Sequence, residues 1–111
     1  MIEPGPSFRD NLAQLPPVSG VERIDLIDAH GAVVDTIPNA PGKQGSLAVY
    51  RYLGDCFGKL DAAAAAHGLK VFGEHTADAR ERPGAHPNID RLLAIAAGAP
   101  ALAIAVIAAQ G

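Results

Sequence analysis

The sequence has little of the residue types that mark several classes of protein. It contains one cysteine, Cys56, no tryptophan, and only five Tyr or Phe in 111 residues. A single thiol cannot form an internal disulfide, and this favours a reducing compartment, so we expect a cytoplasmic protein. With a net charge of −3 and no cluster of Lys or Arg, the chain also lacks the basic patch and the stacking aromatics of nucleic-acid-binding proteins.

Long stretches without charge are rare as well. The exception runs from Leu92 to Ala109, where every residue is apolar, Gly or Pro, at the length of a membrane-spanning helix. Alanine gains little from lipid, and Gly98-Ala99-Pro100 divides the run into two pieces with different periods. We therefore expect no membrane span here, but a helix, a turn and a buried strand. The N-terminal residues have no signal-peptide pattern, and residues 1–5 are expected to be disordered.

What is present is the pattern of one soluble α/β domain that covers residues 1–111. The hydrophobic fraction of 49% and the charged fraction of 19% are typical of a globular protein. Periodicity, caps and Gly or Pro breaks predict a helix at 7–15, strands at 21–28 and 32–37, helices at 46–57 and 62–67, a strand at 69–74, one or two helical turns from Thr76, a helix ending at Ala97, and a strand at 101–108.

These elements predict a four-stranded mixed sheet in the order α-β-β-α-α-β-α-β, with the short turns at Thr76 left uncounted. The first two strands form an antiparallel hairpin, and the strand-helix-strand units after it are expected to be right-handed parallel crossovers. In the last strand, Leu102, Ile104 and Val106 alternate with alanines. Because neither face carries a polar residue, we expect both faces to be buried and the strand to lie inside the sheet.

The predicted topology points to one edge of the sheet as the place for a site. In open α/β sheets, ligands bind beside the loops that leave the carboxyl ends of the strands. Residues 38–46 and 75–88 would be two such loops, and they are the most polar and turn-rich stretches of the chain. We therefore expect the two loops to line a common pocket.

The first loop ends at the start of a predicted helix, where free backbone N–H groups and the helix dipole favour an anion. Lys43 would add a positive charge there, and Gln44 and Ser46 would add polar groups. The spacing is not that of a Walker loop. The competing interpretation is that Gly45-Ser46 only turns the chain and caps the helix.

The second loop contains the candidate acid/base residues. His75 is the best candidate, because it follows a predicted strand and is adjacent to Glu74, which could hold one ring nitrogen. His86 is the second candidate, although its position before Pro87 also suits an ordinary helix start. The ligand-binding candidates are Lys43, Gln44, Ser46, His86, Asn88 and Arg91.

Arg91 is included because a cation in the first turn of a helix is unfavourable unless an anion accompanies it. No metal site is predicted, since the histidines and carboxylates match no ligand spacing. The competing interpretation of the whole loop is a solvated acidic and basic surface with Thr76 and Asn88 as helix caps.

Two stretches, Gly42-Lys43-Gln44-Gly45-Ser46-Leu47-Ala48-Val49-Tyr50 and Gly84-Ala85-His86-Pro87-Asn88-Ile89-Asp90-Arg91-Leu92-Leu93, resemble a small family of uncharacterised bacterial proteins, a domain of unknown function. The resemblance extends from the first predicted helix to the last predicted strand. It implies a compact cytoplasmic bacterial protein and carries over no activity, cofactor or catalytic residue.

Besides a metal-binding protein that would use His75 and His86, two functions from different classes remain open at this point. One is an accessory or protein-interaction domain, in which an edge strand of the sheet would pair either with a second copy of the chain or with a protein partner. The alternative is a binder of, or an enzyme acting on, a small anionic metabolite such as a phosphate or carboxylate, at loops 38–46 and 75–88.

Overall fold

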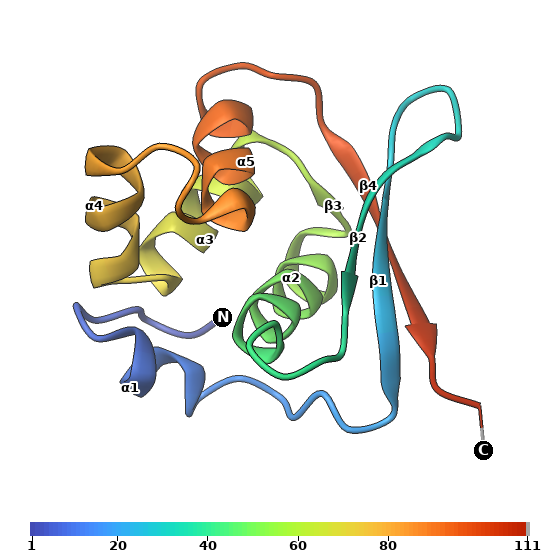
Figure 1. Cartoon of the computed structure of the whole chain (residues 1–111), viewed down its shortest axis with the longest axis horizontal. Coiled ribbons are helices and arrows are strands. Elements are labelled where there is room, and N and C mark those ends of the chain that lie inside the picture. The colour runs from blue at the N-terminus through green and yellow to red at the C-terminus, as the bar shows by residue number, and fades with distance from the viewer. Residues whose placement is uncertain (111) are drawn as a thin grey trace.

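The computed structural model describes residues 1–110 as two layers, a four-stranded sheet with the helices packed on one of its faces (Figure 1). In chain order, the elements are α1 (Phe8–Leu12), β1 (Val21–Ile27), β2 (Val33–Pro38), α2 (Gln44–Phe57), β3 (Lys59–Leu60), α3 (Ala62–Val71), α4 (Glu74–Glu81), α5 (Pro87–Ala96) and β4 (Leu102–Ala108). The α/β class is therefore as predicted.

The sheet has the order β2-β1-β4-β3, and every neighbouring pair of strands is antiparallel. The predicted hairpin is confirmed, because β1 pairs with β2 from Arg23↔Pro38 to Ile27↔Val33. The predicted parallel crossovers are wrong. β4 returns along β1 in the opposite direction, and β3 contributes only two residues at one end of β4.

The error in topology comes from residues 69–74, which form no strand. α3 passes through Gly68 and continues to Val71, and α4 begins at Glu74. Gly68 is inside α3 for a packing reason: a Cβ there would lie 2.8 Å from a methyl of Leu53 and 2.9 Å from a methyl of Leu92. The missing side chain lets α2 and α5 approach α3 closely, so this glycine does not end the helix.

The hydrophobic core lies between the sheet and the helical layer. Ile24, Leu26 and Ile37 project from the sheet and are buried against the helical layer, together with Leu53 and Leu92. β4 has the predicted interior position, between β1 and β3, but the expectation that both its faces are buried is wrong. The helices cover a single face of the sheet, so the other face is open (Figure 1). The alanines that alternate with Leu102, Ile104 and Val106 in β4 lie on this open face.

The C-terminal apolar run forms α5, a turn and β4, as its two periods predict. Among residues 1–110, no helix has both the length and the apolar character needed to cross a membrane.

The N-terminal segment is attached to the helical layer by hydrogen bonds. Residues 1–5, predicted to be disordered, form no helix or strand, but the Ile2 N–H donates to the hydroxyl of Tyr52 over 3.0 Å. The buried amide of Asn11 accepts from the Gly5 N–H at 2.8 Å and donates to the carbonyl oxygens of Gly5 and Val71. This segment matters for the site because it positions Phe8.

Candidate functional site

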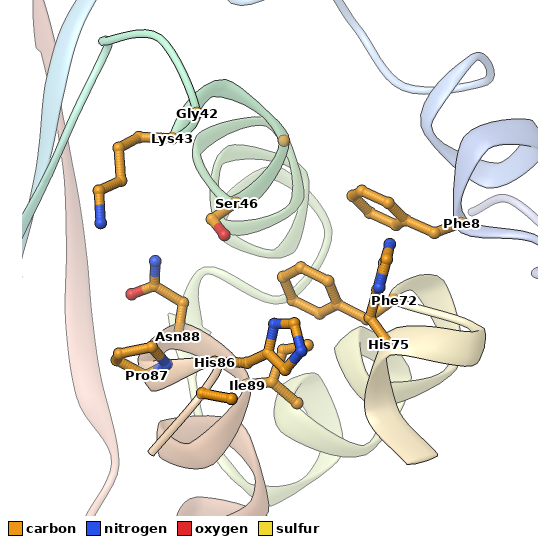
Figure 2. Close-up of a pocket in the computed structure, with 12 residues that line it drawn as sticks. Phe8, Gly42, Lys43, Ser46, Phe72, His75, His86, Pro87, Asn88 and Ile89 are labelled. Atoms are coloured by element: carbon orange, nitrogen blue, oxygen red, sulfur yellow. The ribbon is translucent and has the colours of Figure 1, made fainter. Parts of the chain in front are cut away.

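A pocket of about 240 Å³ opens between the N-terminal ends of α2 and α5, the start of α4, and α1 (Figure 2). Five of the seven predicted site residues line it: Lys43, Ser46, His75, His86 and Asn88. The remaining lining residues are Phe8, Gly42, Gly45, Phe72, Ala85, Pro87 and Ile89. The two loops thus meet, although the parallel strands that led us to expect this are absent.

The loops meet because the helices that follow them pack together. The hydroxyl of Tyr50, in the second turn of α2, donates a hydrogen bond of 2.6 Å to the carbonyl oxygen of Asn88 in the first turn of α5. This bond brings the starts of the two helices together. Lys43, Ser46 and Asn88 consequently face the same space, with the Asn88 amide turned toward the side of α2 that carries Lys43 and Ser46 (Figure 2).

Neither helix start is closed by a capping side chain. The N-cap positions are Lys43 for α2 and His86 for α5, and neither side chain makes a capping hydrogen bond. Ser46 lies inside α2, so the interpretation of Ser46 as the N-cap is wrong. Thr76, also expected as a cap, instead lies within α4 and donates to the carbonyl oxygen of Leu69. Free N–H groups at the start of α2 therefore border the pocket.

His86 is held by a carboxylate from α4. Its Nε2 lies 2.6 Å from Oδ2 of Asp78, and Asp78 also accepts from Nε of Arg82 at 2.9 Å. The Arg82 guanidinium and then His86 hold the pKa of the Asp78 carboxyl well below its usual value, so this carboxylate is charged at neutral pH. Asp78 orients the imidazole and leaves Nδ1 as its second ring nitrogen.

His75 occupies a different setting from the one expected. It lies in the first turn of α4 rather than after a strand, and its Nε2 is 3.7 Å from Oε1 of Glu74, too far for a hydrogen bond. The Glu74 carboxylate instead accepts from the Phe8 N–H at 3.0 Å. The His75 ring contacts Phe8 edge-on, with 5.2 Å between ring centroids, and its centroid lies 5.8 Å from that of His86. His86, with a carboxylate behind it, is the better placed acid/base group.

The two remaining predicted residues make other contacts. The side-chain amide of Gln44 donates to Oδ1 of Asn39 at 2.8 Å. Arg91 forms an ion pair with Asp35 of β2 and donates to Oδ1 of Asn88 at 2.9 Å and to the hydroxyl of Tyr50 at 3.1 Å. Asp35 supplies the negative partner that the position of Arg91 required, so no bound anion is needed to explain that charge.

No metal centre is evident. In the described part of the chain, 1–110, no three His, Cys, Asp or Glu side chains are grouped closely enough to hold a metal ion.

Tyr50 provides a test of the junction between α2 and α5. Burial raises its pKa to about 12, and Arg91 offsets part of that rise. Because the folded pKa lies above the unfolded value near 10, the stabilisation is complete below pH 10 and disappears as the pH rises toward 12. We expect the free energy of unfolding to fall over this window by up to about 3 kcal/mol.

The measurement is urea unfolding at stepped pH, with a Tyr52→Phe background so that the absorbance of the ionised phenol reports Tyr50 alone. In the Tyr50→Phe variant, the alkaline decline should be shallower by that amount. Titration of Tyr50 near pH 10 in the folded Tyr52→Phe protein would contradict the assigned burial.

The comparison with known proteins agrees with the resemblance noted from the sequence. DUF2322, described as an uncharacterised protein conserved in bacteria, matches residues 8–106. No curated protein and no solved structure is similar enough to the chain to count as a match. The match takes in all the residues that line the pocket and all of the sheet except Ile107 and Ala108 at the end of β4. The chain belongs to the bacterial family DUF2322.

Proposed function

We propose that the chain binds a small anionic molecule, a phosphate or a carboxylate, in the pocket between α2, α4 and α5. The observation that carries this proposal is the composition of the lining. The chain as a whole has a net charge of −3, yet the residues that line the pocket include Lys43, His75 and His86 and no Asp or Glu. Such a local excess of donors and positive charge favours an anion.

Hydrogen-bond donors supplement the charge of Lys43. Oδ1 of Asn88 is occupied by Arg91, so the NH₂ group of its amide is the part left for a ligand. The Ser46 hydroxyl points toward the same space (Figure 2). Backbone N–H groups in the first turn of α2, which the absence of a capping side chain leaves free, add the positive end of the helix dipole.

The pocket also has an apolar part. Phe8 and Phe72 stack with 5.3 Å between ring centroids, and Ile89 also lines the pocket. A ligand that combines an anionic group with a flat apolar part would contact both the polar groups and the aromatic rings. The volume of about 240 Å³ is below the ~300 Å³ at which drug-sized pockets begin, so we infer a small metabolite.

The Asp78–His86 pair would supply a proton donor or acceptor next to such a ligand. A carboxylate-oriented imidazole is a common arrangement for acid/base chemistry, so an enzyme acting on the anion is an extension of this proposal. We infer a cytoplasmic setting from the single cysteine.

Isothermal titration with benzoate, phenyl phosphate and inorganic phosphate tests the proposal, with benzylamine as the cationic control. We expect at least one anion to bind and benzylamine not to bind. Lys43→Gln should weaken that binding about tenfold, the value of one charge-assisted contact. Lys59→Gln removes the same charge from an exposed position in β3 and should leave the affinity unchanged. Equal affinity in Lys43→Gln, or no binding of any anion, would overturn the proposal.

A further inference from the structure

The outer edge of β4 is mostly unpaired. On one side, β4 pairs with β1 from Ala103 to Ala108, but on the other side β3 covers only Leu102 and Ala103. β3 stops at Leu60 because the next residue, Asp61, is the N-cap of α3 and accepts from the Ala64 N–H at 2.9 Å. Residues 104–108 therefore form a five-residue open edge, which we call the β4 edge.

The direction of the backbone groups along this edge follows from strand geometry. The Ala109 N–H donates to the carbonyl oxygen of Gly20 on the β1 side. Because N–H and C=O groups alternate between the two sides of a strand, those of Ile104, Val106 and Ala108 point away from β1. In the described residues 1–110, no strand or side chain pairs with them. Backbone groups directed outward in this way form a template for another strand.

The other edge of the sheet is protected, and the contrast is informative. β2 has a bulge opposite Leu26 and Ile27, ends in Pro38 and carries Asp35, three features that discourage strand addition. The β4 edge, Ile104-Ala105-Val106-Ile107-Ala108, has no charge, no proline and no bulge of its own. Val106 is 42% exposed.

We propose that the β4 edge pairs antiparallel with the β4 edge of a second copy of this chain, about a two-fold axis perpendicular to the sheet. The two sheets would join into one sheet of eight strands, with both helical layers on the same face. A centre at Val106 places Ile104 opposite the partner's Ala108, so that all three outward-facing residues gain partners. Longer pairing is blocked, because β3 occupies the edge from Ala103 onward.

A second copy suits this edge better than an unrelated strand for two reasons. The β4 edge has the same number of unpaired residues in both copies. Each copy can therefore pair all the outward-pointing backbone N–H and C=O groups of the other. The paired segments carry no charge, so a two-fold arrangement brings no like charges opposite each other. For the same reason, we expect the dimer to be nearly insensitive to salt.

Light scattering after size exclusion, over a range of protein concentrations, tests the dimer. We expect a mass twice that of the chain for the wild type and a monomer for Val106→Lys, since a charge would then face its own copy across the axis. Val34→Lys is the matched control: Val34 is 52% exposed on the protected β2 edge, and this variant should remain dimeric.

Val106→Pro provides a second route. Proline removes only the N–H that points away from β1, so pairing with β1 and the fold should survive while the dimer is lost. Hydrogen exchange should show slow exchange of the backbone amides of residues 104 and 106 in the wild type and fast exchange of both in Val106→Lys. Val106→Pro has no amide at position 106, so the Ile104 amide is the one that should become fast in that variant. The amides of Ala105 and Ile107 should stay protected in all three proteins. A wild-type monomer at all concentrations would overturn the proposal, as would a dimer that survives Val106→Lys. Failure here would leave the pocket proposal intact, because the anion titration measures a different surface.

Discussion

Replacing Gly73 with alanine should lower the free energy of unfolding by about 2–4 kcal/mol. Gly73 has φ +58°, and a Cβ there would lie 2.7 Å from the carbonyl oxygen of Pro6 and 2.9 Å from the backbone nitrogen of Phe8. Because both neighbours are backbone atoms, the N-terminal segment itself would have to move. Phe8 would shift with it, so we also expect weaker binding of any anion that contacts the aromatic wall of the pocket.

Gly84→Ala is the matched control for this substitution, measured in the same urea titrations. Gly84 also has a positive φ, +91°, but a Cβ there would meet nothing within 4 Å. Only the conformational cost should remain, about 1 kcal/mol. Equal losses in the two variants would mean that close packing of the N-terminal segment against Gly73 contributes nothing to stability.

Asn11→Leu should cost about 2–4 kcal/mol, although leucine is apolar and similar in size. The Asn11 side chain is 1% exposed and satisfies the N–H and C=O of Gly5 and the buried carbonyl of Val71. Leucine would leave these backbone groups buried without hydrogen-bond partners. The free-energy cost of burying them unpaired exceeds the stabilisation gained from burying the apolar leucine side chain.

Gln14→Leu tests whether this effect depends on the buried contacts. Gln14 is exposed just beyond the same helix, and its replacement should change stability by no more than about 0.5 kcal/mol. The comparison uses the midpoints and slopes of urea unfolding for both variants. If Asn11→Leu lowers the free energy of unfolding no more than Gln14→Leu does, the hydrogen bonds of the buried Asn11 amide do not stabilise the fold.

Elements with a clear local pattern could be predicted from the sequence. The helix predicted at 46–57 is α2, and Leu47, Tyr50 and Leu53 lie on its buried face at helical spacing. The predicted hairpin turns at Gly31, which has a positive φ. The stretch 69–74 could not, because a short apolar run fits a strand or a buried helix equally well by period. Its outcome depended on Gly68, whose role as a contact surface for α2 and α5 is not visible locally.

The candidate site shows the same division. Polarity and turn content in loops 38–46 and 75–88 were enough to select residues that line one pocket, although the topological reason offered for their meeting was wrong. The acidic residues that pair with them could not be predicted from the sequence. Asp78 behind His86 and Asp35 beside Arg91 are brought in by other elements, and nothing in their local sequence distinguishes them from solvated acids.

By itself, the sequence determined where most helices and strands form, which of their faces are apolar, and which polar loops stand apart from them, since each depends on neighbours within a few residues. The tertiary structure alone decided the antiparallel order of the sheet, the convergence of the α2 and α5 N-termini, the pairing of His86 with Asp78 and the open β4 edge. These depend on how helices pack over one face of the sheet, and contacts between residues distant along the chain leave no local pattern.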